Sequence, residues 1–137
     1  MAKFEGRIVV ITGSDSGIGQ SMAEEFAREG ADIAISFHTD QTSAKKTQAL
    51  VAGAGRGAIV RQVDVRLEAS VAELFEAVDR ELGRPDILVN NAGVGAGGAM
   101  VAETSTQEFD NVLKTDMYGP FFCCPEFIRR RQDVGRG

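Results

Sequence analysis

The sequence predicts an α/β fold with a doubly wound parallel sheet, and three observations support this prediction. Short apolar runs rich in β-branched residues alternate with segments whose apolar residues recur at helical spacing. A glycine-rich stretch joins the first apolar run to the first helical segment. The chain shows neither an internal repeat nor a low-complexity segment. We expect about four strands in the spatial order 3-2-1-4, connected by right-handed crossovers.

Length and composition indicate one globular domain and exclude several classes of function. The 137 residues, 1–137, suffice for a single domain, and 43% hydrophobic and 26% charged residues are typical of globular proteins. The formal net charge of −5 argues against a nucleic-acid partner. No apolar run approaches the ~20 residues of a membrane span, and the N-terminus lacks the features of a signal peptide. We therefore expect a cytoplasmic protein without membrane association.

The first half of the chain alternates strand and helix. Residues 7–12 and 31–37 are short, apolar and rich in isoleucine or valine, which predicts two buried strands. Residues 16–29 between them have a helical apolar pattern, and Gly30 is well placed to end that helix. The next two expected elements are a weaker helix and a third strand, at residues 42–52 and 58–63.

The second half holds the clearest helical pattern in the chain. Its apolar residues all fall on one helical face, and Gly83 and Pro85 end it. They are Val71, Leu74, Phe75, Val78 and Leu82. A fourth strand is expected at residues 86–90, followed by a glycine-rich loop at 93–98.

Two further helices are expected toward the C-terminus. Ser105 and Glu108 have the spacing of a capping box, which predicts a helix across residues 109–113. Residues 116–131 also favour a helix, but two prolines in this segment oppose a regular one. The arginine run at the end of the segment suits the negative end of a helix dipole.

The glycine-rich stretch at residues 12–19, T-G-S-D-S-G-I-G, indicates a phosphate site. A strand that turns sharply into a helix directs unpaired N–H groups and the positive end of the helix dipole at one place. Gly13 supplies the turn, Gly17 lets a pyrophosphate approach the backbone, and Gly19 lets the helix pack closely on its strand. Glycine-rich turns of this kind also occur without a ligand, so the stretch alone leaves that alternative open.

The glycine spacing and a second motif resemble those of the short-chain dehydrogenase/reductase family. The glycines follow the form T-G-x-x-x-G-I-G, which differs from the general dinucleotide fingerprint G-x-G-x-x-G. The second motif, Asn-Asn-Ala-Gly at residues 90–93, follows the fourth expected strand, where that family places it. The resemblance covers essentially the whole chain. It implies a Rossmann-type fold, present here as its N-terminal, cofactor-binding part with an incomplete sheet.

The resemblance implies an oxidoreductase that, in its full-length form, transfers hydride between a nicotinamide dinucleotide and a ketone or secondary alcohol. The best-matching subclass resembles the glucose dehydrogenases and 3-oxoacyl reductases, so the expected substrate is a small carbonyl or alcohol compound. The full-length form is expected to be a homo-oligomer. The implied cofactor-binding residues are Thr12, Gly13, Ser14, Ser16, Gly17, Ile18, Gly19, Ser36, His38, Asp64, Val65, Asn91, Ala92 and Gly93.

By the same resemblance, each group of these residues has a role. The glycine turn is implied to hold the pyrophosphate, and residues 91–93 to lie along a ribose of the cofactor. Asp64 and the backbone of Val65 are implied to hold the adenine. An ordinary turn carboxylate at the end of a strand is the alternative explanation of Asp64.

The residues after the second strand favour NADP over NAD. NAD-binding members usually place an acidic residue at the end of that strand to hold the ribose hydroxyls. Ser36 occupies the position, Asp32 lies too early and Asp40 too late. Ser36 is expected to donate a hydrogen bond to the 2′-phosphate of NADP, and His38 to add partial positive charge. NAD stays the alternative, because no Arg or Lys stands where NADP-preferring members often carry one.

The catalytic Tyr-x-x-x-Lys motif of the family is absent from this chain. Tyr118 is the only tyrosine, and Phe122 stands where the lysine would be. In the family the tyrosine transfers the proton and the lysine lowers the pKa of the tyrosine. Asp116 stands where the family has the asparagine of its proton relay, and an ordinary polar residue at a helix bend explains it equally well. We expect the chain alone to be inactive.

The order of the motifs indicates an incomplete domain, either truncated or completed by a partner. Residues 133–137 resemble the lead-in to a fifth strand, which precedes the missing triad in the family. The fourth strand would then be an exposed apolar edge, and the apolar face around Phe121, Phe122 and Phe127 would lose part of its cover. A non-catalytic dinucleotide-binding or interaction module is the main alternative. An adenosylmethionine-dependent methyltransferase is disfavoured, because the second strand does not end in an acidic residue.

No metal site is expected. His38 is the only histidine, and Cys123 and Cys124 are adjacent, without the spacing of zinc ligands. Adjacent cysteines do not readily form a disulfide with each other. We expect both to be buried thiols in a reducing compartment.

Overall fold

Four parallel strands form one sheet in the order β3-β2-β1-β4 in the computed structural model, which describes residues 2–95 and 97–132. The strands are β1 (Ile8–Ile11), β2 (Asp32–Phe37), β3 (Ala58–Gln62) and β4 (Ile87–Val89). In the register, Val9 of β1 lies between Ile33 of β2 and Ile87 of β4. The predicted strand order and the parallel sheet are therefore confirmed.

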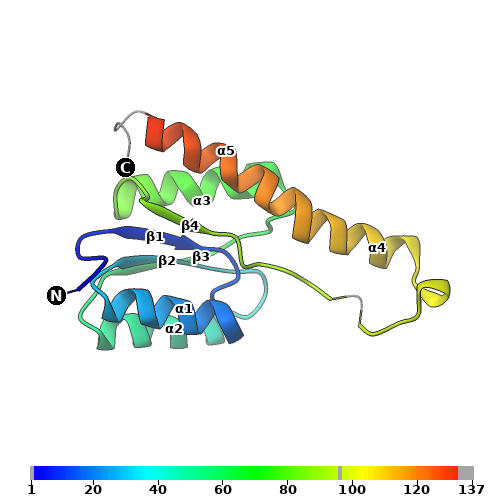
Figure 1. Ribbon diagram of the computed structural model, residues 1–137, viewed down its shortest axis with the longest axis horizontal. Coiled ribbons are helices and arrows are strands. Elements are labelled where there is room, and N and C mark those ends of the chain that lie inside the picture. Colours follow the sequence, from blue (N-terminus) through cyan, green and yellow to red (C-terminus); the bar gives the residue numbers. More distant parts are fainter. Residues whose placement is uncertain (1, 96, 133–137) are drawn as a thin grey trace.

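Helices cover both faces of this sheet (Figure 1). On one face lie α1 (Gly17–Arg28) and α2 (Gln41–Gly53), and on the other lie α3 (Glu68–Glu81) and α5 (Gly119–Gln132). Each helix falls within a few residues of the range that the apolar pattern predicts. The doubly wound arrangement buries both faces of the strands, which explains why their sequences are continuously apolar.

The core consists of two clusters, one on each side of the sheet. Val10 points into the cluster that α3 and α5 cover, whereas Val9 and Ile11 point into the cluster that α1 and α2 cover. This alternation is the two-residue period of a strand. Each fully buried Val, Ile, Leu or Phe side chain contributes about 1.5–3 kcal/mol. The predicted helical face of α3 supplies Leu74, Phe75 and Val78 to the first cluster.

The helix ends follow local capping rules. Gly30 has φ +98° and follows Glu29, the C-cap of α1, as predicted for a residue that ends a helix. Asp40 begins α2, because its carboxylate accepts a hydrogen bond from the Ser43 N–H at 2.9 Å. Ser105 and Glu108 form the predicted capping box at the start of α4 (Thr106–Leu113). Asp40 is thus the N-cap of α2, and β2 ends before it, at Phe37.

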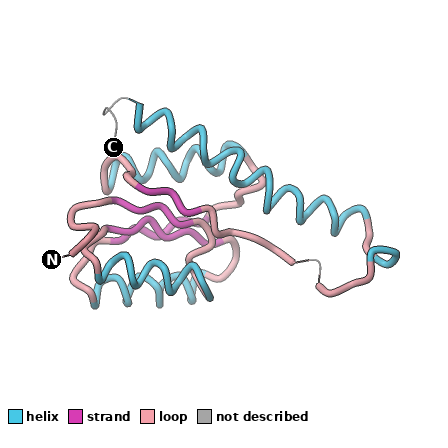
Figure 2. Tube along the Cα trace, viewed as in Figure 1, coloured by secondary structure: helices cyan, strands magenta, loops and turns pink. Residues whose placement is uncertain are grey.

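A π-helical turn joins α4 to α5. The turn spans Lys114–Tyr118, and Figure 2 shows the two helices running through it as one long rod that extends past the sheet. Pro120 lies near the start of α5 and Pro125 lies inside it, so both are accommodated in a helix despite the missing N–H groups. The sequence predicts helix here but not the π turn or the short 3-10 turn at Val101–Glu103.

The arginine run at the end of α5 is paired with carboxylates. Arg129 and Arg130 contact Glu126, Arg130 also contacts Asp79, and Arg131 contacts Asp86. The arginine run therefore links α5 to α3 and to the residue just before β4 by ion pairs, and its positive charge also interacts favourably with the negative end of the α5 dipole. Residues 133–137, the predicted lead-in to a fifth strand, lie outside the described residues.

The two cysteines differ in their surroundings. Cys123 is buried in the core under α5, and burial raises the pKa of its thiol to about 12. Cys124 is half-buried, and both thiols are free. Among the described residues, no helix is long and apolar enough to cross a membrane.

Candidate functional site

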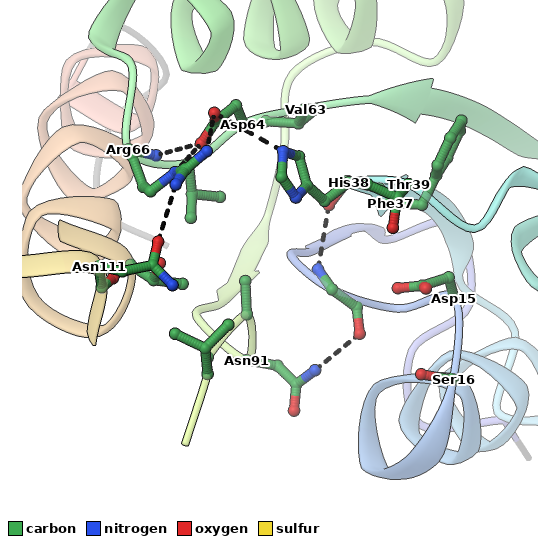
Figure 3. Close-up of a pocket in the computed structure, with 17 residues that line it drawn as sticks. Asp15, Ser16, Phe37, His38, Thr39, Val63, Asp64, Arg66, Asn91 and Asn111 are labelled. Atoms are coloured by element: carbon green, nitrogen blue, oxygen red, sulfur yellow. Dashed lines mark hydrogen bonds and ion pairs between the residues drawn. The ribbon is translucent and has the colours of Figure 1, made fainter. Parts of the chain in front are cut away.

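A pocket of about 420 Å³ lies at the carboxyl ends of the strands (Figure 3). Its walls come from the end of β2 and from the segments that follow the four strands, within residues 13–16, 36–39, 63–66 and 91–94, and from Asn111 and Thr115 on the opposite side. The two sequence motifs therefore meet in one cavity. Ligands of open parallel sheets bind at this edge, beside the point where the strand order reverses.

Hydrogen bonds join the glycine turn directly to the Asn-Asn-Ala-Gly motif. The buried Thr12 hydroxyl accepts bonds of 3.0 Å from the backbone N–H groups of Asn91 and Ala92. The Asn91 side-chain amide donates in return to the carbonyl oxygens of Thr12 at 3.1 Å and Gly13 at 2.9 Å. Thr12 and Asn91 are thus structural members of the site that hold the turn against the end of β4.

Two of the motif glycines are required by close packing. A Cβ at Gly13 would lie 2.9 Å from the Ala92 Cα, and Gly13 also has φ +61°. A Cβ at Gly19 would overlap the Gly13 carbonyl oxygen and lie 2.5 Å from the Asn91 Nδ2. Gly19 therefore lets α1 approach the end of β1, as the sequence predicts.

The third glycine stands where α1 begins and is not enclosed by the protein. Gly17 has φ +54°, and nothing lies within 4 Å of the place that its Cβ would take. Ser16 makes no side-chain cap to the helix, so the first N–H groups of α1 lack both a cap and an intrahelical partner. Ile18 in the same turn is 75% exposed. This open helix start is suited to a phosphate group.

Ser14 and Ser36 hold the turn from within. The buried Ser14 hydroxyl donates to the Ile11 carbonyl oxygen at 2.8 Å and accepts from the Ser36 N–H at 3.1 Å. The Ser36 hydroxyl, in a side chain that is only 1% exposed, accepts from the Gly13 N–H at 3.1 Å. Ser36 therefore supports the glycine turn and also lines the pocket, so its expected bond to a phosphate stays a prediction.

A contact that the sequence does not predict fastens α2 to the same turn. Thr47 is buried, and its hydroxyl donates to the Ser14 carbonyl oxygen and accepts from the Gln20 side-chain amide, both at 2.9 Å. Thr47 lies in a weakly patterned helix 33 residues after Ser14. No local sequence motif marks Thr47, so its contact with the turn can be recognised only in the three-dimensional structure.

Asp64 is held in an ion pair on the far wall of the pocket. The Arg66 guanidinium donates to its carboxylate at 2.8 and 2.7 Å and lowers the pKa of Asp64 below its ordinary value. The His38 Nε2 lies 3.7 Å from the same carboxylate. A third bond from Arg66 reaches the Asn111 side-chain oxygen at 2.7 Å, which links this wall to α4. The sequence predicts Asp64 and His38 but not Arg66 or Asn111.

Asp116 lies on the π turn. Its Oδ1 accepts a bond of 3.0 Å from the Val94 N–H. A Cβ at Gly93 would lie 3.3 Å from that oxygen, so a glycine there gives the carboxylate room. Asp116 does not line the pocket, and its side chain positions the loop that follows the Asn-Asn-Ala-Gly motif. Within residues 2–95 and 97–132, no cluster of three or more metal-ligating side chains occurs.

The comparisons with known proteins identify the family. The short chain dehydrogenase model matches residues 7–137. The chain belongs to the short-chain dehydrogenase family. Probable oxidoreductase EphD of Mycobacterium tuberculosis is 40% identical over 134 residues, which are 98% of this chain and 22% of that protein. A short-chain type dehydrogenase/reductase of Picea abies is 33% identical over 96% of this chain and 51% of its own length.

Solved short-chain dehydrogenases share the fold. NAD⁺-bound xylitol dehydrogenase matches with a TM-score of 0.92 and 30% identity, over 98% of this chain and 52% of that one. A double mutant of a Serratia marcescens short-chain dehydrogenase/reductase matches with a TM-score of 0.87 and 26% identity, over 93% of this chain and 51% of that one. The chain therefore spans about half the length of these members of the family.

Proposed function

We propose that this chain is the dinucleotide-binding part of a short-chain dehydrogenase that uses a nicotinamide cofactor. The observation that carries the proposal is the single pocket in which both motifs meet at the strand ends, against the open start of α1. Its volume of about 420 Å³ lies within the range of small-molecule sites, and part of an extended dinucleotide would project from it.

The chemistry of the pocket fits the successive parts of a dinucleotide. The unpaired N–H groups at the start of α1 suit the pyrophosphate, because they present donors and a positive dipole end. Asp64 and the backbone of Val65 face the same cavity and suit the adenine. Asn91, Ala92 and Gly93 line the opposite end and suit a ribose. The bound cofactor would supply hydride transfer, while these residues bind and orient it.

The end of β2, considered alone, favours NADP, with NAD as the alternative. Asp40 is held by Ser43 at the start of α2, and Asp32 pairs with Arg56 at the other end of the strand. No carboxylate of β2 or of the segment after it therefore reaches the ribose position in the described structure. A 2′-phosphate would meet Phe37, His38 and Thr39 on this wall.

In its full-length form, the proposed reaction is hydride transfer to a ketone or from a secondary alcohol. The family match supports this reaction class. We expect a small-molecule substrate, a cytoplasmic location and a homo-oligomer. The 137 residues include neither a Tyr-x-x-x-Lys motif nor a second tyrosine beside Tyr118, so we expect them to bind the cofactor without turnover. A non-catalytic dinucleotide-binding module is the second candidate.

A titration of the chain with NADH and NADPH tests the proposed binding. Ser16→Tyr places a bulky ring at the exposed edge of the pocket and removes no cap bond, because Ser16 makes none. Ser21→Tyr adds the same ring at an exposed position of α1 outside the pocket. We expect calorimetry to show binding by the wild type and by Ser21→Tyr, with weaker binding by Ser16→Tyr. Equal affinities for all three proteins would place the ligand elsewhere.

A turnover assay separates the two candidate functions. A longer chain that carries the family's catalytic residues after residue 137 should oxidise or reduce a secondary alcohol or ketone with the bound cofactor. If the longer chain binds the dinucleotide but shows no hydride transfer with a panel of such substrates, the non-catalytic module is the better account.

A further inference from the structure

We infer that Asp15 selects the cofactor, favouring NAD over NADP. The inference rests on the proposed function, since it concerns which dinucleotide occupies the same pocket. It also opposes the preference for NADP that follows from the end of β2 alone. The group responsible lies on the opposite wall, inside the glycine turn.

Asp15 faces the part of the pocket where an adenosine ribose would lie. Figure 3 shows its carboxylate directed into the cavity, across from His38 and Thr39 and beside Ser16. The ribose of a dinucleotide in this fold lies between the glycine turn and the end of β2. Asp15 therefore supplies from the turn the carboxylate that the end of β2 lacks.

The carboxylate of Asp15 is available to a ligand. No hydrogen bond or ion pair joins it to any other described residue, although its backbone carbonyl accepts a bond from Gln20 at 3.3 Å. It is only half-buried, so it stays hydrated until a ligand arrives. An unpaired carboxylate beside the ribose site can accept hydrogen bonds from ribose hydroxyls, which are charge-assisted and strong.

The two basic side chains that line the pocket, Arg66 and His38, both lie beside the carboxylate of Asp64. Arg66 donates to Asp64 through two nitrogens and to Asn111 through a third. His38 lies 3.7 Å from Asp64, which favours an interaction with that carboxylate. Among the described residues that line the pocket, no other basic side chain is present to balance a 2′-phosphate. The 2′-phosphate dianion would therefore be repelled by the negative charge of Asp15, with no unpaired basic side chain among the described lining residues to offset the repulsion.

The two cofactors differ at this place only in the 2′ substituent. NAD presents a hydroxyl that can donate a hydrogen bond to the Asp15 carboxylate. NADP presents a dianion that Asp15 repels and that has no donor to offer. Since a tenfold ratio of dissociation constants corresponds to 1.4 kcal/mol, a single charge-assisted contact suffices for a preference of about tenfold.

Calorimetric titrations of wild type, Asp15→Asn and Asp15→Ser with NADH and NADPH test the inference. We expect the wild type to bind NADH about tenfold more tightly than NADPH. Both variants should lose most of this preference, because NADH keeps only a neutral acceptor in place of the charged one and NADPH loses the repulsion. ADP-ribose and 2′-phospho-ADP-ribose should give the same pattern, because they differ only at the 2′ position. Thermal melts establish that each variant is folded.

Asp110→Asn is the matched control, because it removes one carboxylate from an exposed position of α4 outside this pocket. Its preference should equal that of the wild type. Three results would overturn the role of Asp15 while leaving the proposed function intact. The wild type could bind the two cofactors equally, it could bind NADPH more tightly, or both Asp15 variants could keep the wild-type preference. Failure of the folded wild type to bind either dinucleotide would overturn the proposed function and the inference with it.

Discussion

The Thr12 hydroxyl oxygen accepts a hydrogen bond of 3.0 Å from the backbone N–H of Asn91, a residue 79 positions later in the chain. The Asn91 side chain returns two bonds to the backbone of the glycine turn. The two motifs therefore form one hydrogen-bonded unit, in which the segment after β4 holds the turn after β1. Because each motif fixes the position of the other, both are needed to shape the pocket that they line.

Asn91→Asp should damage this unit, whereas Asn90→Asp should not. A carboxylate at residue 91 cannot donate and would face the carbonyl oxygens of Thr12 and Gly13. We expect the free energy of unfolding to fall by about 1–3 kcal/mol, because partly buried acceptors lose their donor. Urea unfolding measures the change. Asn90 is exposed and makes one long contact to sulfur, so its variant is the control, and equal losses in both variants would contradict the account.

Gly19→Ala should destabilise the fold and distort the turn. The new methyl group would overlap the Gly13 carbonyl oxygen and crowd the Asn91 amide, so α1 must move away from β1. The expected cost is about 1–3 kcal/mol, typical of overpacking. Gly53→Ala is the control, because nothing lies within 4 Å of its Cβ position at the end of α2. Thermal melts should show a lower Tm only for the first variant, and a similar fall in both would argue against the close approach.

Thr47→Val should show that α2 supports the glycine turn. Valine keeps the shape of the side chain but leaves the Ser14 carbonyl oxygen without this donor. We expect a loss of about 1–3 kcal/mol in the free energy of unfolding. Thr47→Ser retains the hydroxyl and should lose less. If urea unfolding shows the serine variant to be the less stable of the two, packing of the methyl group matters more than the hydrogen bond.

Asp64 should contribute to stability at neutral pH and lose that contribution in acid. Its pKa is lowered in the folded state from the ordinary value of 3.8 by the hydrogen bonds from Arg66. The contribution is complete above the unfolded-state value and disappears as the pH falls through the lower folded-state value. Asp64→Asn should cost about 1 kcal/mol at pH 7, as an accessible ion pair does. Urea midpoints for the two proteins should converge below pH 3.8, and a constant difference would contradict this assignment.

The two cysteines should react at different rates with a thiol reagent. Cys123 is buried and its pKa is raised to about 12, so little thiolate forms near neutral pH. Cys124 is half-buried and should react first. We expect one fast equivalent in the native protein and two in denaturant. In Cys124→Ser the fast equivalent should vanish, and its persistence would show that Cys123 is accessible.

The strand order, the helix ranges and the capping box could be predicted from the sequence because each has a local signal. Apolar periodicity marks α3, the spacing of Ser105 and Glu108 marks the start of α4, and Gly30 marks the end of α1. Such signals extend over a few residues only. They also locate both motifs at the carboxyl ends of their strands, and thereby the pocket.

The remaining features depend on contacts between distant residues. The bond of Thr47 to the turn and that of Arg66 to Asn111 have no local pattern, since they arise only when α2 and α4 pack in place. The bond from the Gly13 N–H to the buried Ser36 hydroxyl likewise forms only when β2 pairs beside the turn. The π turn also has no signal in the apolar pattern.

We expect a nicotinamide dinucleotide to bind where the two motifs meet. An NMR titration of the ¹⁵N-labelled chain with NADH tests it most directly, because backbone amides report their own surroundings. We predict saturable shifts in residues 13–19, 36–39, 63–66 and 91–94, with little change around Arg61 of β3 and around Glu73 and Arg80 of α3. Shifts confined to the α3 surface, or no saturable shift in the pocket at millimolar NADH, would contradict the account.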